Sequence, residues 1–136
     1  MRVESRARAR ALQAVYAWDM RAGEPLDRVA VRVWDDLAIP ADERKFAERI
    51  VRTLLASAKT IDEQLADVTT NWRLNRLGAI ERSVLRLAVA EMSQGVTPPR
   101  VVIKESMRLA ERYGTPESAR FVNGVLDAYA RRYGLL

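Results

Sequence analysis

The sequence predicts an all-α fold: a compact domain of seven helices. Apolar residues recur with the period of an α-helix, which is the main sequence signal for that element. Proline and glycine lie almost only between the periodic segments, where the chain is expected to turn. Because the chain has 136 residues and 49% of them are hydrophobic, it can build one core, and we expect a single domain over residues 1–136.

The helices are expected at about 4–21, 26–38, 41–57, 59–69, 77–93, 98–112 and 116–132. The second and third follow turn residues at positions 23–25 and 40. Thr97 and Thr115 each precede a proline, which places a capping hydroxyl directly before a proline at the first helical position. These two residues therefore predict the starts of the last two helices.

The helix at 77–93 is predicted to be the central one. Its apolar residues cover a wide arc, so it needs neighbours on several sides; they are Leu77, Ile80, Val84, Leu85, Leu87, Ala88 and Met92. Gly78 indicates either a helix start or close packing. Glu81 and Glu91 fall inside this arc, and Glu105 lies on the apolar side of the next helix. A buried carboxylate requires a partner, which favours ion pairs or a protein interface here.

The composition argues against an enzyme. Cysteine and histidine are absent, which removes thiolate zinc sites, disulfides and the commonest general base. No nucleophile arrangement, metal-ligand set or glycine-rich loop replaces them, so we expect no cofactor. No window approaches the roughly 18 apolar residues of a membrane span, and no signal-peptide core follows Met1. A cytoplasmic protein without membrane contact is expected.

The charge favours an acidic partner. The net charge is +5, the pI is about 10.1, and only three of the 23 basic residues are lysines. Arginine suits bidentate contact with phosphate, but a high-GC genome also replaces lysine with arginine. The composition alone leaves both explanations open.

The most basic segment lies at the start of the first helix. It holds Arg2, Arg6, Arg8 and Arg10. Only Glu4 opposes these four charges, which gives a net of +3 at a helix end where the dipole disfavours cations. When Leu12 is taken as the centre of the apolar stripe, Arg6 and Arg10 fall on the opposite side, whereas the stem of Arg8 can cover the core. The segment is either a solvated basic face or an RNA-binding surface.

The stretch from Arg120 to Asp127 is rich in information. Val125 and Leu126 are expected to face the core. Phe121 either joins them or offers its ring to a base. Gly124 costs about 1 kcal/mol in a helix interior and therefore predicts close helix packing.

Four stretches, in this order and spacing, resemble the NusB family of transcription antitermination factors. They are Ala9–Trp18, Asn71-Trp72 with Arg76-Leu77, Glu81–Ala88 with Glu91, and Phe121–Asp127. The resemblance covers essentially the whole chain. It implies a NusB-like fold of two small helical subdomains, about 1–70 and 71–136.

The resemblance also implies a function. NusB family members pair with a small-subunit ribosomal protein, called NusE in this role, and bind the boxA element of nascent RNA. The complex joins RNA polymerase and suppresses premature termination, notably in ribosomal RNA operons. The positions that match the family's RNA-binding residues are Arg2, Arg6, Arg8, Arg10, Glu117, Arg120 and Phe121. Tyr16, Arg76 and Glu81 match positions that face the protein partner.

The chain departs from the family pattern at Glu4 and Ser5, where many relatives have further arginines. This thins the basic cluster, so we expect the isolated chain to bind RNA weakly and the partner to supply the remaining contacts. The alternative, from another class, is a helical protein-interaction module or homodimer without direct RNA binding.

Overall fold

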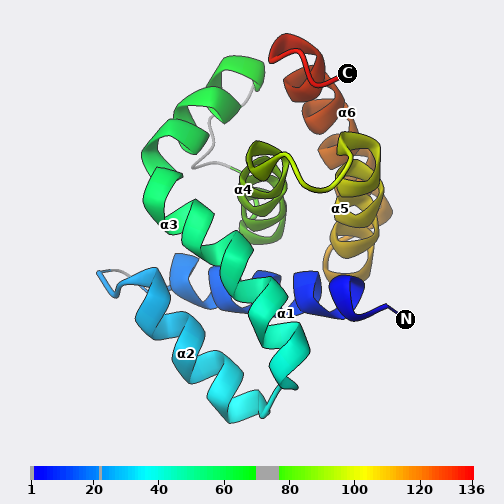
Figure 1. Ribbon diagram of the computed structural model, residues 1–136. Coiled ribbons are helices and arrows are strands. Elements are labelled where there is room, and N and C mark those ends of the chain that lie inside the picture. The colour runs from blue at the N-terminus through cyan, green and yellow to red at the C-terminus, as the bar shows by residue number, and fades with distance from the viewer. Residues whose placement is uncertain (1, 22, 70–76) are drawn as a thin grey trace.

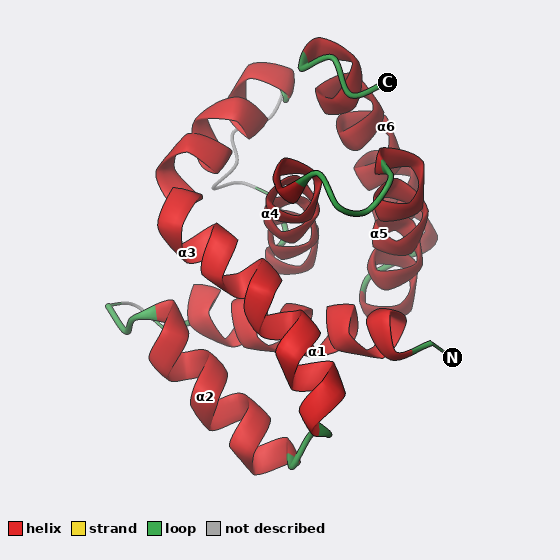
Figure 2. Ribbon diagram, viewed as in Figure 1, coloured by secondary structure: helices red, strands yellow, loops and turns green. Residues whose placement is uncertain are grey.

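The computed structural model describes residues 2–21, 23–69 and 77–136, and these ranges contain helices and no strand (Figures 1 and 2). The helices are α1 (Val3–Asp19), α2 (Leu26–Leu37), α3 (Ala41–Val68), α4 (Ala79–Gln94), α5 (Pro99–Tyr113) and α6 (Pro116–Arg132). The all-α prediction is confirmed. The number seven is wrong, because the helices expected at 41–57 and 59–69 form one element that kinks at Ser57, where φ is −125° and ψ is 18°. A single residue leaves the helical region, which bends α3 without ending it.

The central position predicted for the helix at 77–93 is confirmed for α4. This helix packs against α1, α3, α5 and α6, and Figure 1 shows it in the middle of the molecule. Nine of its residues are buried, more than in any other helix of the described ranges. Its surroundings explain why the apolar arc is wide: a helix with neighbours on several sides has little surface left for water.

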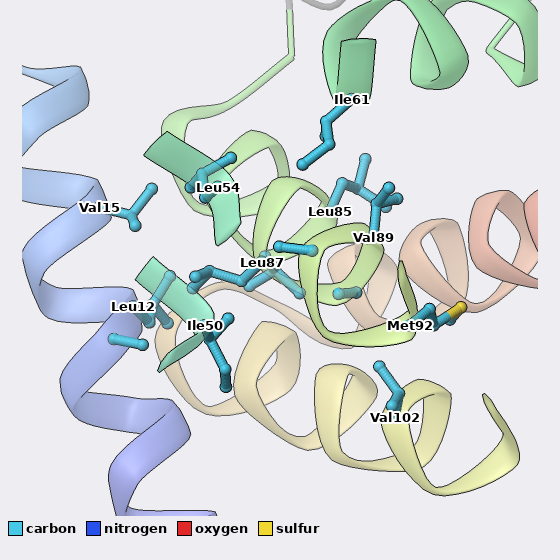
Figure 3. Packing of buried hydrophobic residues seen from close by; sticks show 14 of the residues in the cluster. Leu12, Val15, Ile50, Leu54, Ile61, Leu85, Leu87, Val89, Met92 and Val102 are labelled. Carbon is cyan, nitrogen blue, oxygen red and sulfur yellow. The ribbon is translucent and has the colours of Figure 1, made fainter. Parts of the chain in front are cut away.

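One apolar core receives side chains from all six helices of the described ranges. Leu12 of α1, Leu54 of α3 and Leu85 of α4 are at most 1% exposed, and Figure 3 shows them in the same cluster. Truncating a buried leucine to alanine costs about 2–5 kcal/mol, through lost burial and the cavity that remains. The core therefore holds α1, which carries the basic segment, firmly against α3 and α4.

The helix starts agree with the sequence in one case and differ in the other. Thr115 caps α6: its Oγ1 accepts a hydrogen bond from the backbone N–H of Ser118 at 3.1 Å, and Oγ of Ser118 accepts one from the N–H of Thr115 at 3.2 Å. The cap expected of Thr97 is wrong, because α5 begins at Pro99 and the capping position falls on Pro98. The two consecutive prolines move the helix start one residue along the chain.

Of the two glycines interpreted from the sequence, Gly78 and Gly124, one prediction is confirmed and the other is wrong. Gly78 stands at the capping position of α4, which confirms that it marks a helix start. Gly124 is exposed, and a Cβ added there would meet no atom within 4 Å, so the close packing predicted for it is wrong. Nothing in the structure explains a glycine at position 124.

The boundary expected near residue 70 lies at the edge of residues 70–76, which are outside the described ranges. The division into two subdomains therefore stays a prediction. Within the described ranges, no helix combines the length and the apolar character needed to cross a membrane.

Candidate nucleic-acid interface

The basic segment of α1 lies beside the start of α3. Nε of Arg6 donates to Oε2 of Glu43 at 3.0 Å, and Nε of Arg10 donates to Oε1 of the same carboxylate at 3.3 Å. Glu43 is 3% exposed, whereas the side chains of Arg6 and Arg10 are 40% and 31% exposed. Arg2 is exposed at the capping position of α1. Arg2, Arg6 and Arg10 therefore present positive charge to solvent, although Glu43 neutralises part of it.

Arg8 lies in the interior. Its Nε and Nη2 donate to the two carboxylate oxygens of Glu91 at 2.8 and 2.6 Å, and Nη1 lies 3.6 Å from Oε1 of Glu105. Its guanidinium also covers the ring of Phe46 at 5.2 Å from the centroid. Burial lowers the pKa of Arg8, but the hydrogen bonds and charges of these carboxylates raise it by more, so Arg8 stays charged. An RNA contact by Arg8 would require these pairs to break.

The partners expected for the buried carboxylates are present in this cluster. Glu91 and Glu105 share Arg8, and Oγ of Ser5 donates to Oε1 of Glu105 at 2.7 Å. Ser5, which thins the basic segment in the sequence, thus ties α1 to α5. The cluster orients the first helix and leaves its other arginines outside.

Besides the basic segment of α1, a second patch of expected RNA-binding residues lies at a surface pocket of about 260 Å³, where α4 and α6 begin. Its lining comprises Leu77, Gly78, Glu81, Thr115, Glu117, Ser118 and Phe121. Oε1 of Glu81 accepts a hydrogen bond from Oγ of Ser118 at 2.6 Å, which fixes the carboxylate beside the half-buried ring of Phe121. A Cβ at position 78 would collide with Oε2 of Glu81, so glycine makes room for this carboxylate. The structure thereby brings together Glu81, expected to face a protein, and Phe121, expected to face RNA.

Glu117 lines this pocket, and Arg120 forms an ion pair with it. Both are exposed, and Nη2 of Arg120 donates to Oε1 of Glu117 at 3.2 Å. A hydrogen bond from its own backbone N–H, with further help from Thr115 and Arg120, lowers the pKa of Glu117. The pocket lining therefore carries a carboxylate that is charged at neutral pH and is paired with an accessible guanidinium.

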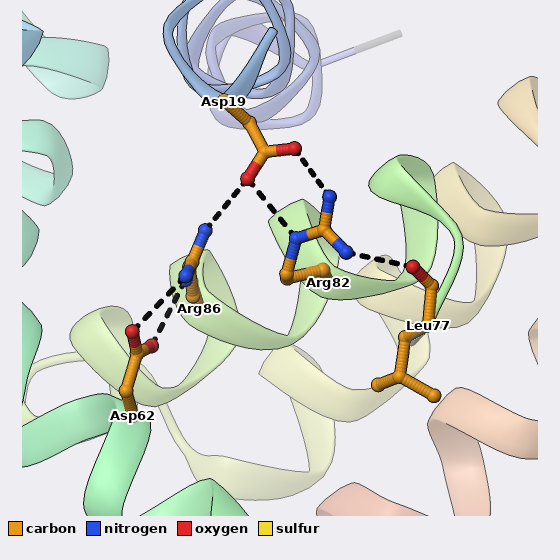
Figure 4. Close-up of polar contacts among 5 residues, drawn as sticks. All are labelled: Asp19, Asp62, Leu77, Arg82 and Arg86. Carbon is orange, nitrogen blue, oxygen red and sulfur yellow. Dashed lines mark hydrogen bonds and ion pairs between the residues drawn. The ribbon is translucent and has the colours of Figure 1, made fainter. Parts of the chain in front are cut away.

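A polar network that sequence reasoning missed joins α1, α3 and α4 (Figure 4). Arg82 donates to both oxygens of Asp19 and, from Nη1, to the backbone oxygen of Leu77 at 2.7 Å. Arg86 donates to Asp19 at 2.9 Å and to both oxygens of Asp62 at 2.9 and 3.0 Å. Two arginines four residues apart on the flank of the central helix were the available signal, because such charges need acidic partners on neighbouring helices.

This network sits next to the positions expected to face a protein partner. Tyr16 lies about one turn before Asp19 on α1 and is 39% exposed, and Glu81 directly precedes Arg82. Arg76, the third of these positions, lies outside the described residues. The ion pair between Asp19 and Arg82 thus connects the two helices that carry Tyr16 and Glu81.

The NusB family model matches residues 5–131. The chain belongs to the NusB family. Transcription antitermination protein NusB of Anaeromyxobacter sp. (strain Fw109-5) is 42% identical over 127 residues, which cover 93% of this chain and 88% of the relative. This match and the all-helical structure confirm the NusB resemblance stated from the four sequence stretches.

Solved NusB structures have the same fold. A crystal structure of antitermination factors NusB and NusE in complex with dsRNA contains a chain that is 31% identical to this one. The two superpose with a TM-score of 0.89 over 98% of this chain and 99% of that one. T. maritima NusB has 32% identity and a TM-score of 0.87, over 94% of this chain and 90% of its own. The NusB fold therefore extends over nearly the full length of the chain.

Proposed function

We propose that this chain is an RNA-binding transcription antitermination factor that pairs with the ribosomal protein NusE on boxA RNA. It joins the antitermination complex of RNA polymerase in the cytoplasm and suppresses premature termination, notably in ribosomal RNA operons, and it is not an enzyme. The observation that carries this proposal is the near full-length match to a NusB chain in a crystal structure with NusE and dsRNA.

The basic segment of α1 supplies phosphate contacts. Arg2, Arg6 and Arg10 present guanidinium groups to solvent, whereas Arg8 fixes the orientation of the helix from inside. Planar guanidinium groups bind phosphate oxygens in pairs of hydrogen bonds. These residues therefore provide affinity that depends on salt but does not depend on base sequence.

The pocket at the starts of α4 and α6 supplies the second part of the interface. Phe121 is half-buried there, and Glu117, which also lines the pocket, is paired with Arg120. An aromatic ring at a pocket edge can stack on an unpaired base, and the neighbouring cation can bind its phosphate. We further infer that Tyr16 and Glu81 face NusE. Arg76, to which the family resemblance gives the same role, lies outside the described residues.

The division of labour between the two proteins follows from Glu43. This carboxylate already holds Arg6 and Arg10, so RNA must compete with it for both side chains. Few arginines of the basic segment can therefore bind phosphate without competition from a carboxylate, and the isolated chain binds RNA weakly. NusE contributes the remaining contacts and most of the selectivity.

The test is a fluorescence titration of labelled boxA RNA and of a scrambled RNA with the same base composition, each with and without NusE. We expect weak, unselective binding by the chain alone and tighter, boxA-selective binding with NusE. Nanomolar, selective binding by the chain alone would contradict the proposed sharing. Failure to bind boxA selectively in the presence of NusE would overturn the function itself and leave a protein-interaction module or homodimer.

A further inference from the structure

We propose that α5 carries a further RNA-binding surface, a basic stripe that holds the phosphate backbone of RNA next to the boxA element. The stripe consists of Arg100, Lys104, Arg108 and Arg112. The inference rests on the proposed function, because it extends the path of an RNA that is already bound. It adds residues that neither the sequence motifs nor the pocket of α4 and α6 include.

The four side chains form a continuous row that winds by about 120° around the helix, because they recur every fourth residue. Successive members lie about 6 Å apart along the helix axis, and the whole row is about 18 Å long. All four residues are exposed, whereas Val102, Ser106 and Ala110 on the opposite side of α5 are buried. The row therefore occupies the outer face of the helix.

The charges of the stripe are not used within the protein. Within the described ranges, no carboxylate lies at ion-pair distance from any of the four, and Arg112 contacts only the ring of Tyr113 at 5.3 Å. Several exposed arginines elsewhere do pair with acids, as Arg52 does with Glu48 and Arg131 with Asp127. The stripe is thus free to bind an external anion.

The acids of α5 do not cancel the stripe. Glu105 turns towards α1, where it accepts from Ser5 and lies near Arg8. Glu111 is the one exposed acid on α5, which leaves four cations against one anion and a net of +3. Like charges four residues apart destabilise a helix slightly, so the arrangement has no local benefit. An external polyanion would supply one.

The location of the stripe suits a continuation of the RNA path. The bond between Ser5 and Glu105 joins the basic segment of α1 to the middle of α5, and Figure 1 shows the N-terminal end of α1 beside α5. At its other end, Arg112 is followed by the turn at Gly114 that leads into α6 with Arg120. The stripe therefore runs between the two patches of the proposed interface and extends beyond them to Arg100.

The chemistry favours RNA over an acidic protein surface. Stable protein interfaces centre on buried apolar or aromatic anchors. On α5, which is described in full, Val101 is the one large apolar side chain that is exposed, at 43%. A row of cations on a convex helix can instead follow a phosphate backbone without any apolar anchor.

The test compares two RNAs in the presence of NusE: a short boxA RNA and the same RNA extended with uridines at both ends. The stripe variant is Lys104→Gln with Arg108→Gln. The control is Arg28→Gln with Arg32→Gln, which removes two exposed charges at the same spacing from α2, a helix that packs on α1 and α3. Dissociation constants are measured over a range of salt concentrations.

We expect the extension to tighten binding by the wild type and by the control. In the stripe variant this gain should be lost, and the salt slope for the extended RNA should fall by about 1.4, as expected for two lost contacts to a single strand. Because part of the stripe lies between the two patches, binding of the short RNA should fall less than binding of the extended RNA. Circular dichroism and thermal unfolding of the variant should match the wild type, because both side chains are exposed.

An equal gain from the extension in the stripe variant would overturn the inference while leaving the boxA function intact. If instead no variant distinguishes boxA from a scrambled RNA, the proposed function fails. In that case oligouridine alone still tests the stripe: weaker binding by the stripe variant than by the control would support it, and equal binding would refute it.

Discussion

Arg8 of α1 and Glu91 of α4 form a two-point ion pair in the interior, with Nε and Nη2 of the arginine 2.8 and 2.6 Å from the two carboxylate oxygens. Their side chains are 9% and 4% exposed. Removing one member of such a pair leaves a buried charge without compensation, which is far more costly than the pair itself is stabilising.

Arg8→Met is therefore expected to lower the free energy of unfolding by about 3–5 kcal/mol, as measured by urea denaturation. The matched double variant, Arg8→Met with Glu91→Leu, should recover most of this loss, since the strongest uncompensated charge is gone. A single variant as stable as the wild type would show that the pair is not formed in solution.

Asp19 should make stability depend on pH in the acidic range. The hydrogen bonds from Arg82, assisted by Arg86, hold the pKa of Asp19 below its ordinary value of 3.8. A carboxyl group with a lower pKa in the folded state adds stability above the unfolded-state value, and this is lost as the pH falls through the folded-state value. Asp19→Asn should thus lower stability at neutral pH and reduce the loss of stability below about pH 4.

Urea denaturation at several pH values checks this prediction. Asp36→Asn serves as the control, because it removes an exposed acid from α2. Parallel pH profiles for Asp19→Asn and the wild type would contradict the role assigned to the Asp19 carboxylate.

Arg6→Ala with Arg10→Ala is expected to weaken RNA binding and lower its salt slope by about 1.4 if each side chain holds one phosphate. The structure adds a second effect: Glu43 would remain buried without its two arginine partners, so stability should also fall. Adding Glu43→Gln should restore much of the stability without restoring RNA affinity. Titration and thermal unfolding of the same samples separate the two effects, and unchanged RNA affinity in either variant would exclude these arginines from the interface.

Phe121→Leu distinguishes the two roles considered for this ring. Leucine keeps apolar contact with the core but cannot stack on a base, and stacking contributes about 1–3 kcal/mol per base. We expect RNA affinity in the presence of NusE to fall by roughly tenfold or more, with little change in the unfolding midpoint. A loss of stability with unchanged RNA affinity would assign Phe121 to the core.

The sequence predicted most of the helices and the central position of α4, because both depend on local periodicity and on the width of an apolar arc. It divided α3 in two, since a kink at one serine leaves the same pattern as a short break. The helical angles also predicted that Arg6 and Arg10 lie opposite the apolar stripe of the first helix and that Arg8 can lie against the core, and Arg8 is buried. Its exact partners were beyond reach, because Glu91 lies 83 residues away.

The candidate site could be predicted only in part for the same reason. Sequence spacing gives the face of a helix on which a side chain lies, but it does not give the neighbouring helix. The carboxylate of Glu43 between Arg6 and Arg10, and the bond from Ser118 to Glu81, depend on tertiary packing. Both change the expected chemistry: the first weakens a basic patch, and the second fixes an acid beside an aromatic ring.

Two ion pairs fasten α1 to α4, Arg8 with Glu91 near one end and Asp19 with Arg82 near the other. The two points are about 16 Å apart along α1, so neither helix can slide or rotate against the other without breaking both. The distance between the basic segment and the surface of Tyr16 and Glu81 is thereby set by the rise of α1 and by its fixed position on α4. An RNA and a protein bound at these two surfaces would therefore be held at a constant distance from each other.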